Sequence, residues 1–195
     1  MKKIEKNSKT IECILKAFLG ESGARNRYTY YAKTAKKEGY EQISSIFEET
    51  ANNEKEHAKR LIKFLGDELI TLTINEAMYP VGMTNSTLKN LEFSAQGEKE
   101  ENTVLYPEFQ RIAKEEGYIE VANCFKEIIE VEKVHEKRYL DLIKNIKEDK
   151  VFKKDKETIW KCRNCGYHHK GLSAPDICPS CLHSISYFEV YVKNY

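Results

Sequence analysis

Two Glu-x-x-His steps, Glu54 to His57 and Glu132 to His135, lie 78 residues apart in this chain of 195 residues. Positions i and i+3 of an α-helix project from nearly the same side, so each step offers one carboxylate and one imidazole together. A single step carries little information, because Glu and His at this spacing are common on surface helices. The two steps together predict a carboxylate-bridged site for two metal ions.

The same offset relates much of the chain around the two steps. The stretch AKKEGY at residues 35–40 returns as AKEEGY at residues 113–118. The offset of 78 also carries Tyr28 to Tyr106, Phe47 to Phe125 and Arg60 to Arg138. Matches at one offset across helix faces and the turn between them indicate that one helix-turn-helix unit occurs twice. Two such hairpins would make one four-helix bundle.

Composition argues against several kinds of partner. The net charge is only +1, from 32 Lys and Arg against 31 Asp and Glu, and the two signs are interspersed. We therefore expect neither nucleic acid nor a membrane as a partner. No apolar run approaches the ~20 residues that span a bilayer, and the first residues lack the apolar core of a secretory signal. These features predict a cytoplasmic protein, where a cysteine cluster more often holds metal than forms disulfides.

Hydrophobic periodicity and helix-end signals predict four long helices, at residues 10–37, 41–65, 86–115 and 119–147. Ser8 or Thr10 is the expected N-cap of the first helix, and Gly39 and Gly117 end the first and third helices. Residues 66–84 are too many for a tight hairpin loop. A crossover of this length makes the second and third helices parallel, as in ferritin-like bundles.

Acidic and imidazole side chains lie in the middle of the apolar stripes of these helices. They are Glu21 in the first helix, Glu54 and His57 in the second, Glu98 in the third, and Glu132 and His135 in the fourth. An isolated buried carboxylate costs several kcal/mol or takes up a proton. Two cations of charge +2 or +3 would balance the group. The alternative for any single glutamate is that it faces solvent or pairs with Arg25, Arg27 or a lysine.

The repeat contains one slip. Glu21 and Glu98 are 77 residues apart, whereas Tyr28 and Tyr106 are 78 apart. One extra residue in a continuous helix is the usual origin of a π-bulge, and such bulges favour functional sites. We predict a π-bulge between Glu98 and Tyr106 that turns Glu101, which has no counterpart in the first hairpin, toward the metal ions. The alternative is a looser alignment of the two repeats.

Four cysteines near the end of the chain form two Cys-x-x-Cys pairs, Cys162 with Cys165 and Cys178 with Cys181. Four thiolates at this spacing surround one ion tetrahedrally, which suits zinc or a single iron. The cysteines alone favour a structural zinc ribbon, but the surrounding WKCRNCGY and APDICPSC are typical of rubredoxin knuckles. An iron ion there would make this part of the chain a one-electron carrier.

The remaining cysteines and histidines have simpler interpretations. Cys13 and Cys124 fall on predicted helices, where small packing residues are expected. His168, His169 and His183 lie in the tail around the four cysteines and are not needed as ligands, so we expect them at the solvated surface.

Together these parts resemble the rubrerythrin family over essentially the whole chain. The motifs are FLGESGARNRY around Glu21, ETANNEKEHAKR around Glu54, GEKEEN around Glu98, VEKVHEKR around Glu132, and both cysteine knuckles, in family order. The resemblance implies an all-α ferritin-like four-helix bundle with a crossover between the second and third helices, followed by a small rubredoxin-like metal-knuckle domain with short β-strands. We expect the bundle at residues 1–148, a linker at 149–157 and the second domain at 158–195.

The resemblance also implies roles for the site residues. Glu54 and Glu132 would bridge the two irons, with Glu21, Glu98, Glu101 and His135 as terminal ligands. His57 is expected to exchange with Glu101 as one iron changes oxidation state. Cys162, Cys165, Cys178 and Cys181 would hold a third, mononuclear iron, and zinc can substitute because it accepts the same ligands. Tyr28 and Tyr106 either bond near the site, steering peroxide or protons, or simply pack in the core.

The implied activity is peroxidase activity, the reduction of hydrogen peroxide to water in defence against oxidative stress. Electrons would come from a rubredoxin or from a separate reductase linked to NAD(P)H. The chain would form a homodimer or higher homo-oligomer, in which one subunit's rubredoxin domain approaches the other's bundle. Two alternatives remain: iron oxidation and storage of the ferritin type, and a zinc-ribbon interaction module fused to an inert bundle.

Overall fold

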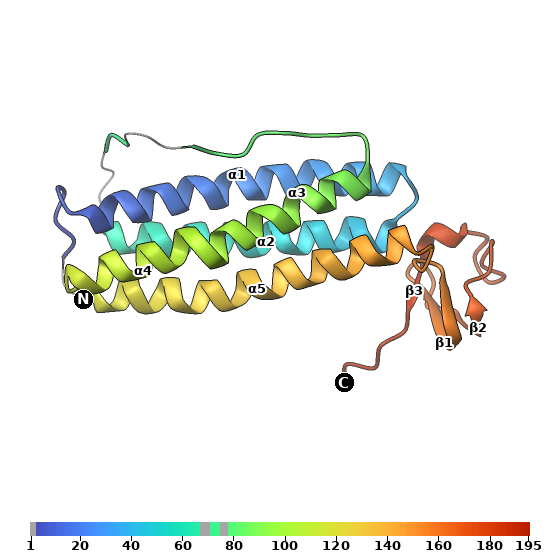
Figure 1. The fold of residues 1–195 in the computed structure, drawn as a ribbon. Coiled ribbons are helices and arrows are strands. Elements are labelled where there is room, and N and C mark those ends of the chain that lie inside the picture. Colours follow the sequence, from blue (N-terminus) through green and yellow to red (C-terminus); the bar gives the residue numbers. More distant parts are fainter. Residues whose placement is uncertain (1–2, 67–70, 75–77) are drawn as a thin grey trace.

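Two helical hairpins form the bundle in the computed structural model, which describes residues 3–66, 71–74 and 78–195 (Figure 1). The first hairpin consists of α1 (Lys9–Lys37) and α2 (Glu41–Ile62), the latter prolonged by a 3-10 turn at Lys63–Leu65. The second consists of α3 (Thr87–Glu100), a π-helical turn (Glu101–Leu105), α4 (Tyr106–Glu115) and α5 (Ile119–Lys147). The four predicted helices and the predicted π-bulge are confirmed. The bulge divides the third predicted helix into α3 and α4.

The repeated sequence produces the same turn twice. Gly39 and Gly117 adopt φ angles of 82° and 78°, a left-handed conformation that glycine adopts without steric cost. In both turns the next residue donates back to the last helical turn, from Tyr40 N to Ala35 O at 2.9 Å and from Tyr118 N to Ala113 O at 2.8 Å. The duplication therefore extends to backbone hydrogen bonds, and it makes each hairpin antiparallel.

The glutamate of each repeated turn also caps the other hairpin. Glu116 accepts hydrogen bonds from the backbone N–H groups of Lys9 and Thr10 at the start of α1, at 3.0 and 2.9 Å. Glu38 accepts one from the backbone N–H of Thr87 at the start of α3, at 2.7 Å. The first N–H groups of a helix have no partner within the helix, so a carboxylate placed there stabilises it. These contacts join the hairpins.

The described part of the connection between α2 and α3 lies along α1, and α2 and α3 run in the same direction (Figure 1). Side chains of α1 hold its backbone: Arg27 donates to the carbonyl of Pro80 at 3.0 Å and Tyr31 to that of Gly82 at 2.7 Å. The predicted crossover is thus confirmed for its described part, while positions 67–70 and 75–77 lie outside the described residues.

Two apolar clusters fill the bundle, one on each side of the predicted metal ligands. One contains Ile14, Phe64 and Phe125, and the other contains Tyr31, Phe47 and Tyr139. In α1 the first cluster ends at Ala17 and the second begins at Ala24, so Glu21 falls between them. The bundle therefore has rigid apolar packing above and below a polar centre. Among the described residues, no helix is both long and apolar enough to cross a membrane.

A small antiparallel sheet follows the bundle at its far end (Figure 1). Its strands are β1 (Lys153–Cys162), β2 (His168–Ser173) and β3 (Phe188–Val190), in the order β2-β1-β3. Trp160 of β1 is fully buried and donates from its indole N–H to the carbonyl of Gly171 at 3.1 Å. Phe152 stacks on Tyr40 of the bundle, with ring centroids 6.1 Å apart. β1 thus begins within residues 149–157, the stretch expected as linker, and the domain limits stay a prediction.

Candidate metal centres

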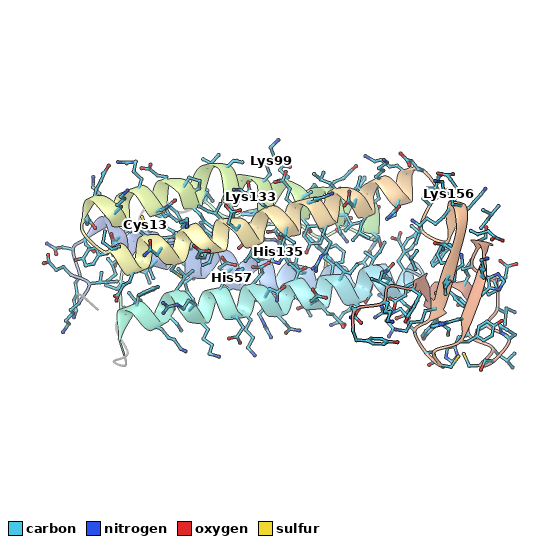
Figure 2. All side chains as sticks on the ribbon, turned by 90° about the horizontal axis from the view of Figure 1, so that it is seen from below. Cys13, His57, Lys99, Lys133, His135 and Lys156 are labelled. Atoms are coloured by element: carbon cyan, nitrogen blue, oxygen red, sulfur yellow. The ribbon has the colours of Figure 1, made fainter. Side chains whose placement is uncertain are left out.

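The bundle brings six predicted ligands together at its centre. Glu21, Glu54, His57 and Glu132 form one group, and Glu54, Glu98, Glu132 and His135 form another, with ligand atoms within 4.8 Å of one another in each. Both groups contain Glu54 and Glu132, so these two carboxylates lie between the two positions. Figure 2 shows His57 and His135 near the middle of the bundle. The arrangement suits two cations bridged by two carboxylates.

Each imidazole points its Nδ1 atom at the shared carboxylates. His57 Nδ1 lies 3.0 Å from Glu54 Oε2 and 3.0 Å from Glu132 Oε1. His135 Nδ1 lies 2.8 Å from Glu132 Oε2 and 3.2 Å from Glu54 Oε1. The ring centroids are 6.3 Å apart. Because both histidines present the same nitrogen to the same two glutamates, the geometry has an approximate two-fold symmetry that follows the sequence repeat.

The donor atoms of this cluster are poorly satisfied by the protein alone. Despite these short distances, Glu54 Oε1, Glu98 Oε2, both carboxylate oxygens of Glu132 and Nδ1 of His135 are buried and make no contact with hydrogen-bond geometry among the described residues. Buried polar atoms are rarely left in this condition, because each costs about 1–3 kcal/mol. Carboxylate oxygens and imidazole nitrogens converging on two points are the ligands that iron and zinc accept. The donor set therefore fits two metal ions.

Burial and like charge change the protonation of the cluster. Burial, followed by the neighbouring charge of Glu54, raises the pKa of Glu21 and of Glu98 well above the ordinary value. For His135, burial disfavours the imidazolium, but the carboxylates of Glu132 and Glu54 outweigh it and raise its pKa to about 12. Burial opposes the charged form of His57 as well, and Glu132 and Glu21 outweigh it, so its pKa is also raised. Metal ions must therefore displace protons on binding.

Two buried tyrosines donate hydrogen bonds to Glu21 and Glu98, the outer glutamates, each of which belongs to only one of the two groups. The hydroxyl of Tyr106 donates to Glu21 Oε1 at 2.5 Å, and that of Tyr28 donates to Glu98 Oε1 at 2.5 Å. Each bond joins one hairpin to the other, since Tyr28 and Glu21 lie on α1. The tyrosines also pack in the core, while their predicted role in steering peroxide or protons stays a prediction. Hydrogen bonds of this kind orient a ligand and fix which oxygen remains for the metal.

Glu101 is the first residue of the π turn and lies just outside the two groups. Its Oε1 atom is 3.8 Å from the position that a Cβ atom would occupy at Gly20, so the side chain faces α1 next to Glu21. Burial and the charges of Glu21 and Glu98 raise the pKa of Glu101 well above the ordinary value. The π turn thus turns this carboxylate toward the cluster, while its role as a ligand stays a prediction.

Asn102 is a residue of the site that motif analysis missed. It is buried, and its amide donates to the carbonyl of Glu98 and to Oε2 of Glu136, each at 2.8 Å. These bonds fasten the π turn to α5 and so support the neighbouring Glu101. The only signal in the sequence is its place directly after Glu101, in the part of the repeat that has no counterpart.

The four cysteines of the second domain converge as predicted. All four Sγ atoms lie within 4.8 Å of one another, with Cys162 and Cys181 at 3.7 Å and Cys165 and Cys178 at 3.6 Å. A disulfide would need about 2.05 Å, whereas a tetrahedron with metal–sulfur bonds of about 2.3 Å has an edge of about 3.8 Å. The geometry therefore fits one tetrahedral metal ion. The backbone N–H of His183 helps to lower the pKa of Cys181 to about 6, which favours the thiolate.

Other candidates lie outside both centres. Cys13 is buried, and burial raises the pKa of its thiol to about 12, in keeping with a packing role. Figure 2 shows it toward the end of the bundle, away from His57 and His135. His168 is exposed, as expected, whereas His169 and His183 are half-buried. Neither of these histidines joins the cysteine group. The ring of His183 packs against that of Tyr187, with centroids 4.5 Å apart.

Known proteins share both halves of this arrangement. The rubrerythrin family model matches residues 12–143, and the model of the rubrerythrin rubredoxin-like domain matches residues 160–189. Rubrerythrin-1 of Clostridium acetobutylicum is 55% identical over 192 residues, covering 97% of this chain and 98% of its own length. The rubrerythrin of Nitratidesulfovibrio vulgaris is 51% identical over 191 residues, covering 97% and 98%.

Solved structures agree in fold. Nigerythrin in a partially reduced state has a TM-score of 0.62 and 32% identity, covering 96% of this chain and 92% of its own. The bacterioferritin of Desulfovibrio desulfuricans, a protein with a di-iron site, has a TM-score of 0.62 and 28% identity, covering 73% and 82%. The bundle thus has a ferritin-like fold that carries a di-iron carboxylate site, and it is joined to a four-cysteine rubredoxin knuckle. The chain belongs to the rubrerythrin family.

Proposed function

We propose that this chain is a non-haem di-iron peroxidase that reduces hydrogen peroxide to water, with electrons relayed through its rubredoxin-type iron centre. The observation that supports this most is the presence in one chain of a buried two-metal carboxylate cluster and a four-thiolate site. Reduction of one peroxide needs two electrons and two protons and yields two water molecules. Two ferrous ions held by these residues would supply both electrons together, without the one-electron step that releases hydroxyl radical.

The chain's own residues would prepare the cluster for this reaction. Glu54 and Glu132 hold the two positions at a short distance, and Tyr28 and Tyr106 keep the outer glutamates oriented. The two apolar clusters on either side exclude bulk water from the centre.

Electron supply requires a partner chain in this proposal. The sheet lies at the end of the bundle, beyond α5, and α5 extends 12 residues past His135, which is about 18 Å of helix (Figure 1). We therefore infer at least a homodimer, in which the rubredoxin domain of one subunit serves the cluster of the other. The external donor would be a rubredoxin or an NAD(P)H-linked reductase in the cytoplasm.

Two other functions share part of this arrangement. Ferritin-type iron oxidation and storage would use the same cluster, but storage needs no reducing input, and the four-cysteine domain argues against it. A zinc-ribbon interaction module on an inert bundle would leave the buried donor atoms without purpose. Metal analysis separates the second alternative, because a ferric tetrathiolate is red and a zinc site is colourless.

The direct test is oxidation of the chemically reduced protein. We expect hydrogen peroxide to oxidise the di-iron centre much faster than dioxygen does. Metal content per chain is measured on the same sample, with three irons expected. If peroxide failed to reoxidise the centre, or dioxygen did so equally fast, the peroxidase proposal would be wrong.

A variant separates the two centres. Cys162→Ser should abolish turnover with an electron-donor chain while one reaction of the pre-reduced cluster with peroxide persists. Cys13→Ala is the matched control, because this thiol is buried in the apolar core away from both sites. Equal loss of both reactions in Cys162→Ser would contradict the division of labour between the two domains.

A further inference from the structure

The six clustered residues differ in their access to solvent. Five of them have side chains at most 2% exposed, whereas the imidazole of His57 is 14% exposed. Its partners Glu21, Glu54 and Glu132 lie directly behind it. A small molecule from solvent therefore meets this imidazole first on its way to the carboxylates.

A surface hollow leads to this imidazole. It lies between α2 and α5, has a volume of about 550 Å³, and is lined by His57 and Arg60 from α2 and by Cys124, Ile128 and Val131 from α5, among others. The guanidinium of Arg60 stands over the ring of Phe64, 4.3 Å from its centroid, which draws the longest side chain of the rim away from the imidazole. The imidazole of His57 therefore stays accessible from the hollow.

A second cavity reaches the neighbourhood of the cluster from the α1 and α3 side. It has a volume of about 190 Å³ and lies beneath the crossover, with Tyr28, Tyr31 and Gly97 among its lining residues. None of the six clustered residues, all of them described, lines it. The ring of Tyr28 stands between this cavity and Glu98, and its hydroxyl is bonded to that carboxylate. Passage here would require breaking that hydrogen bond.

We propose that the hollow beside His57 is the entrance by which hydrogen peroxide reaches the di-iron cluster, and that Cys124 sets its width. The inference rests on the proposed peroxidase function and adds the route of the substrate. Cys124 is half-buried on the wall of the hollow and packs against the apolar cluster below it, so a group attached to its sulfur occupies the hollow rather than the core. Peroxide is small and neutral, so width and not charge decides its passage.

The thiol of Cys124 provides the test. Holoprotein is treated with methyl or benzyl methanethiosulfonate, and modification is verified by mass spectrometry. We expect the benzyl group to lower the second-order rate constant for oxidation of the reduced cluster by peroxide by about tenfold or more, a barrier increase of about 1.4 kcal/mol. The methyl group should have a smaller effect. Cys124→Phe places a similar obstruction without the reagent.

Azide binding to the oxidised cluster is the second readout and does not depend on activity. An obstructed entrance slows association and dissociation of azide together, so the dissociation constant should stay the same while both rate constants fall. Iron content and the visible spectrum of the tetrathiolate should not change. A shifted dissociation constant, with only one of the two rate constants changed, would mean a distorted cluster and would overturn the proposal.

Two controls make the result specific. Cys124→Ser treated with the same reagent should keep its rate constants, because it lacks the modified thiol. Gly97→Leu fills the other cavity, where a Cβ atom would meet nothing within 4 Å, and should also leave them unchanged. If Gly97→Leu slowed peroxide and azide while the benzyl group on Cys124 did not, the entrance would lie at Tyr28. Failure of the peroxidase function is distinguishable, because unmodified reduced protein would then not react with peroxide although azide would still report on the entrance.

Discussion

Replacing Tyr106 with phenylalanine removes one hydroxyl from the cluster and leaves the ring in place. That hydroxyl donates to Glu21 Oε1 at 2.5 Å, and both residues are at most 2% exposed. Without metal, burial and the charge of Glu54 raise the pKa of Glu21, so its carboxyl group is neutral and the bond contributes about 1 kcal/mol. With metal bound, Glu21 is a carboxylate and the bond contributes about 1.5–3 kcal/mol.

The change in the strength of this hydrogen bond between the metal-free and metal-bound states adds to the free energy of metal binding. It amounts to about 0.5–2 kcal/mol, so Tyr106→Phe should weaken binding of Fe²⁺ by about 2- to 30-fold. The assay is anaerobic calorimetric titration of Fe²⁺ into protein whose carboxylate site alone has been emptied. Tyr28→Phe should behave alike, because Tyr28 bonds Glu98 at the same distance.

Tyr139→Phe is the matched control. Tyr139 is fully buried in the same ring cluster, 5.6 Å from Tyr28 between centroids, and its hydroxyl donates to no cluster carboxylate among the described residues. Its removal should leave Fe²⁺ affinity within about twofold, a change of less than 0.5 kcal/mol. If Tyr106→Phe bound Fe²⁺ as tightly as Tyr139→Phe, the hydroxyl would not orient the ligand and the reasoning would be refuted.

Three further outcomes follow from the helix ends and the π turn. Glu116→Gln should lower the free energy of unfolding by about 0.5–2 kcal/mol, the usual contribution of a cap. Partial burial raises the pKa of Glu116, but hydrogen bonds from Thr10 outweigh it, so the pKa is lowered in the folded state. The stability that the carboxylate contributes is therefore present above the unfolded pKa of about 4.3 and is lost as the pH falls through the folded value. Urea titrations in which the loss caused by Glu116→Gln is no smaller at low pH would contradict this. Gly117→Ala should cost about 1–2 kcal/mol in the same titrations, because φ is 78° there, and an unchanged midpoint would exclude that strain. Deletion of Val104, which is exposed in the π turn, rotates the flanking helices by about 100° relative to each other, so metal content should fall below two ions per bundle, and full occupancy would show that the extra residue is not needed.

Much of the bundle was predictable because its signals are local or repeated. Gly39 and Gly117 marked both hairpin turns, since a left-handed residue after a helix favours glycine. The change of offset from 77 to 78 between Glu98 and Tyr106 located the π turn, which occupies Glu101–Leu105. The convergence of the ligands followed from one argument, that buried carboxylates need compensation.

The side-chain contacts between helices were not predictable from the same signals. Periodicity shows which face of a helix is buried, but it does not show which residue of another helix lies opposite. The capping of α1 by Glu116 and the bond from Asn102 to Glu136 join positions 106 and 34 residues apart and depend on the packed bundle. The early start of β1 at Lys153 was missed because its first five residues, KKDKE, are all charged and offer no apolar face.

The two features that break the symmetry of the repeat, the added Glu101 and the greater exposure of His57, both lie on the Glu21 side of the cluster. Glu101, supplied by the π turn, faces Gly20 next to Glu21, and His57 is the exposed imidazole of the same group. The other half, with Glu98 and His135, is closed to solvent. A symmetric pair of hairpins would hold two equivalent ions, and neither would have a reason to react first. If Glu101 is the ligand that the resemblance implies, the Glu21 position would have both a spare ligand and, through the partly exposed His57, contact with solvent. A substrate that used the proposed entrance would then meet the metal position best able to change its ligands.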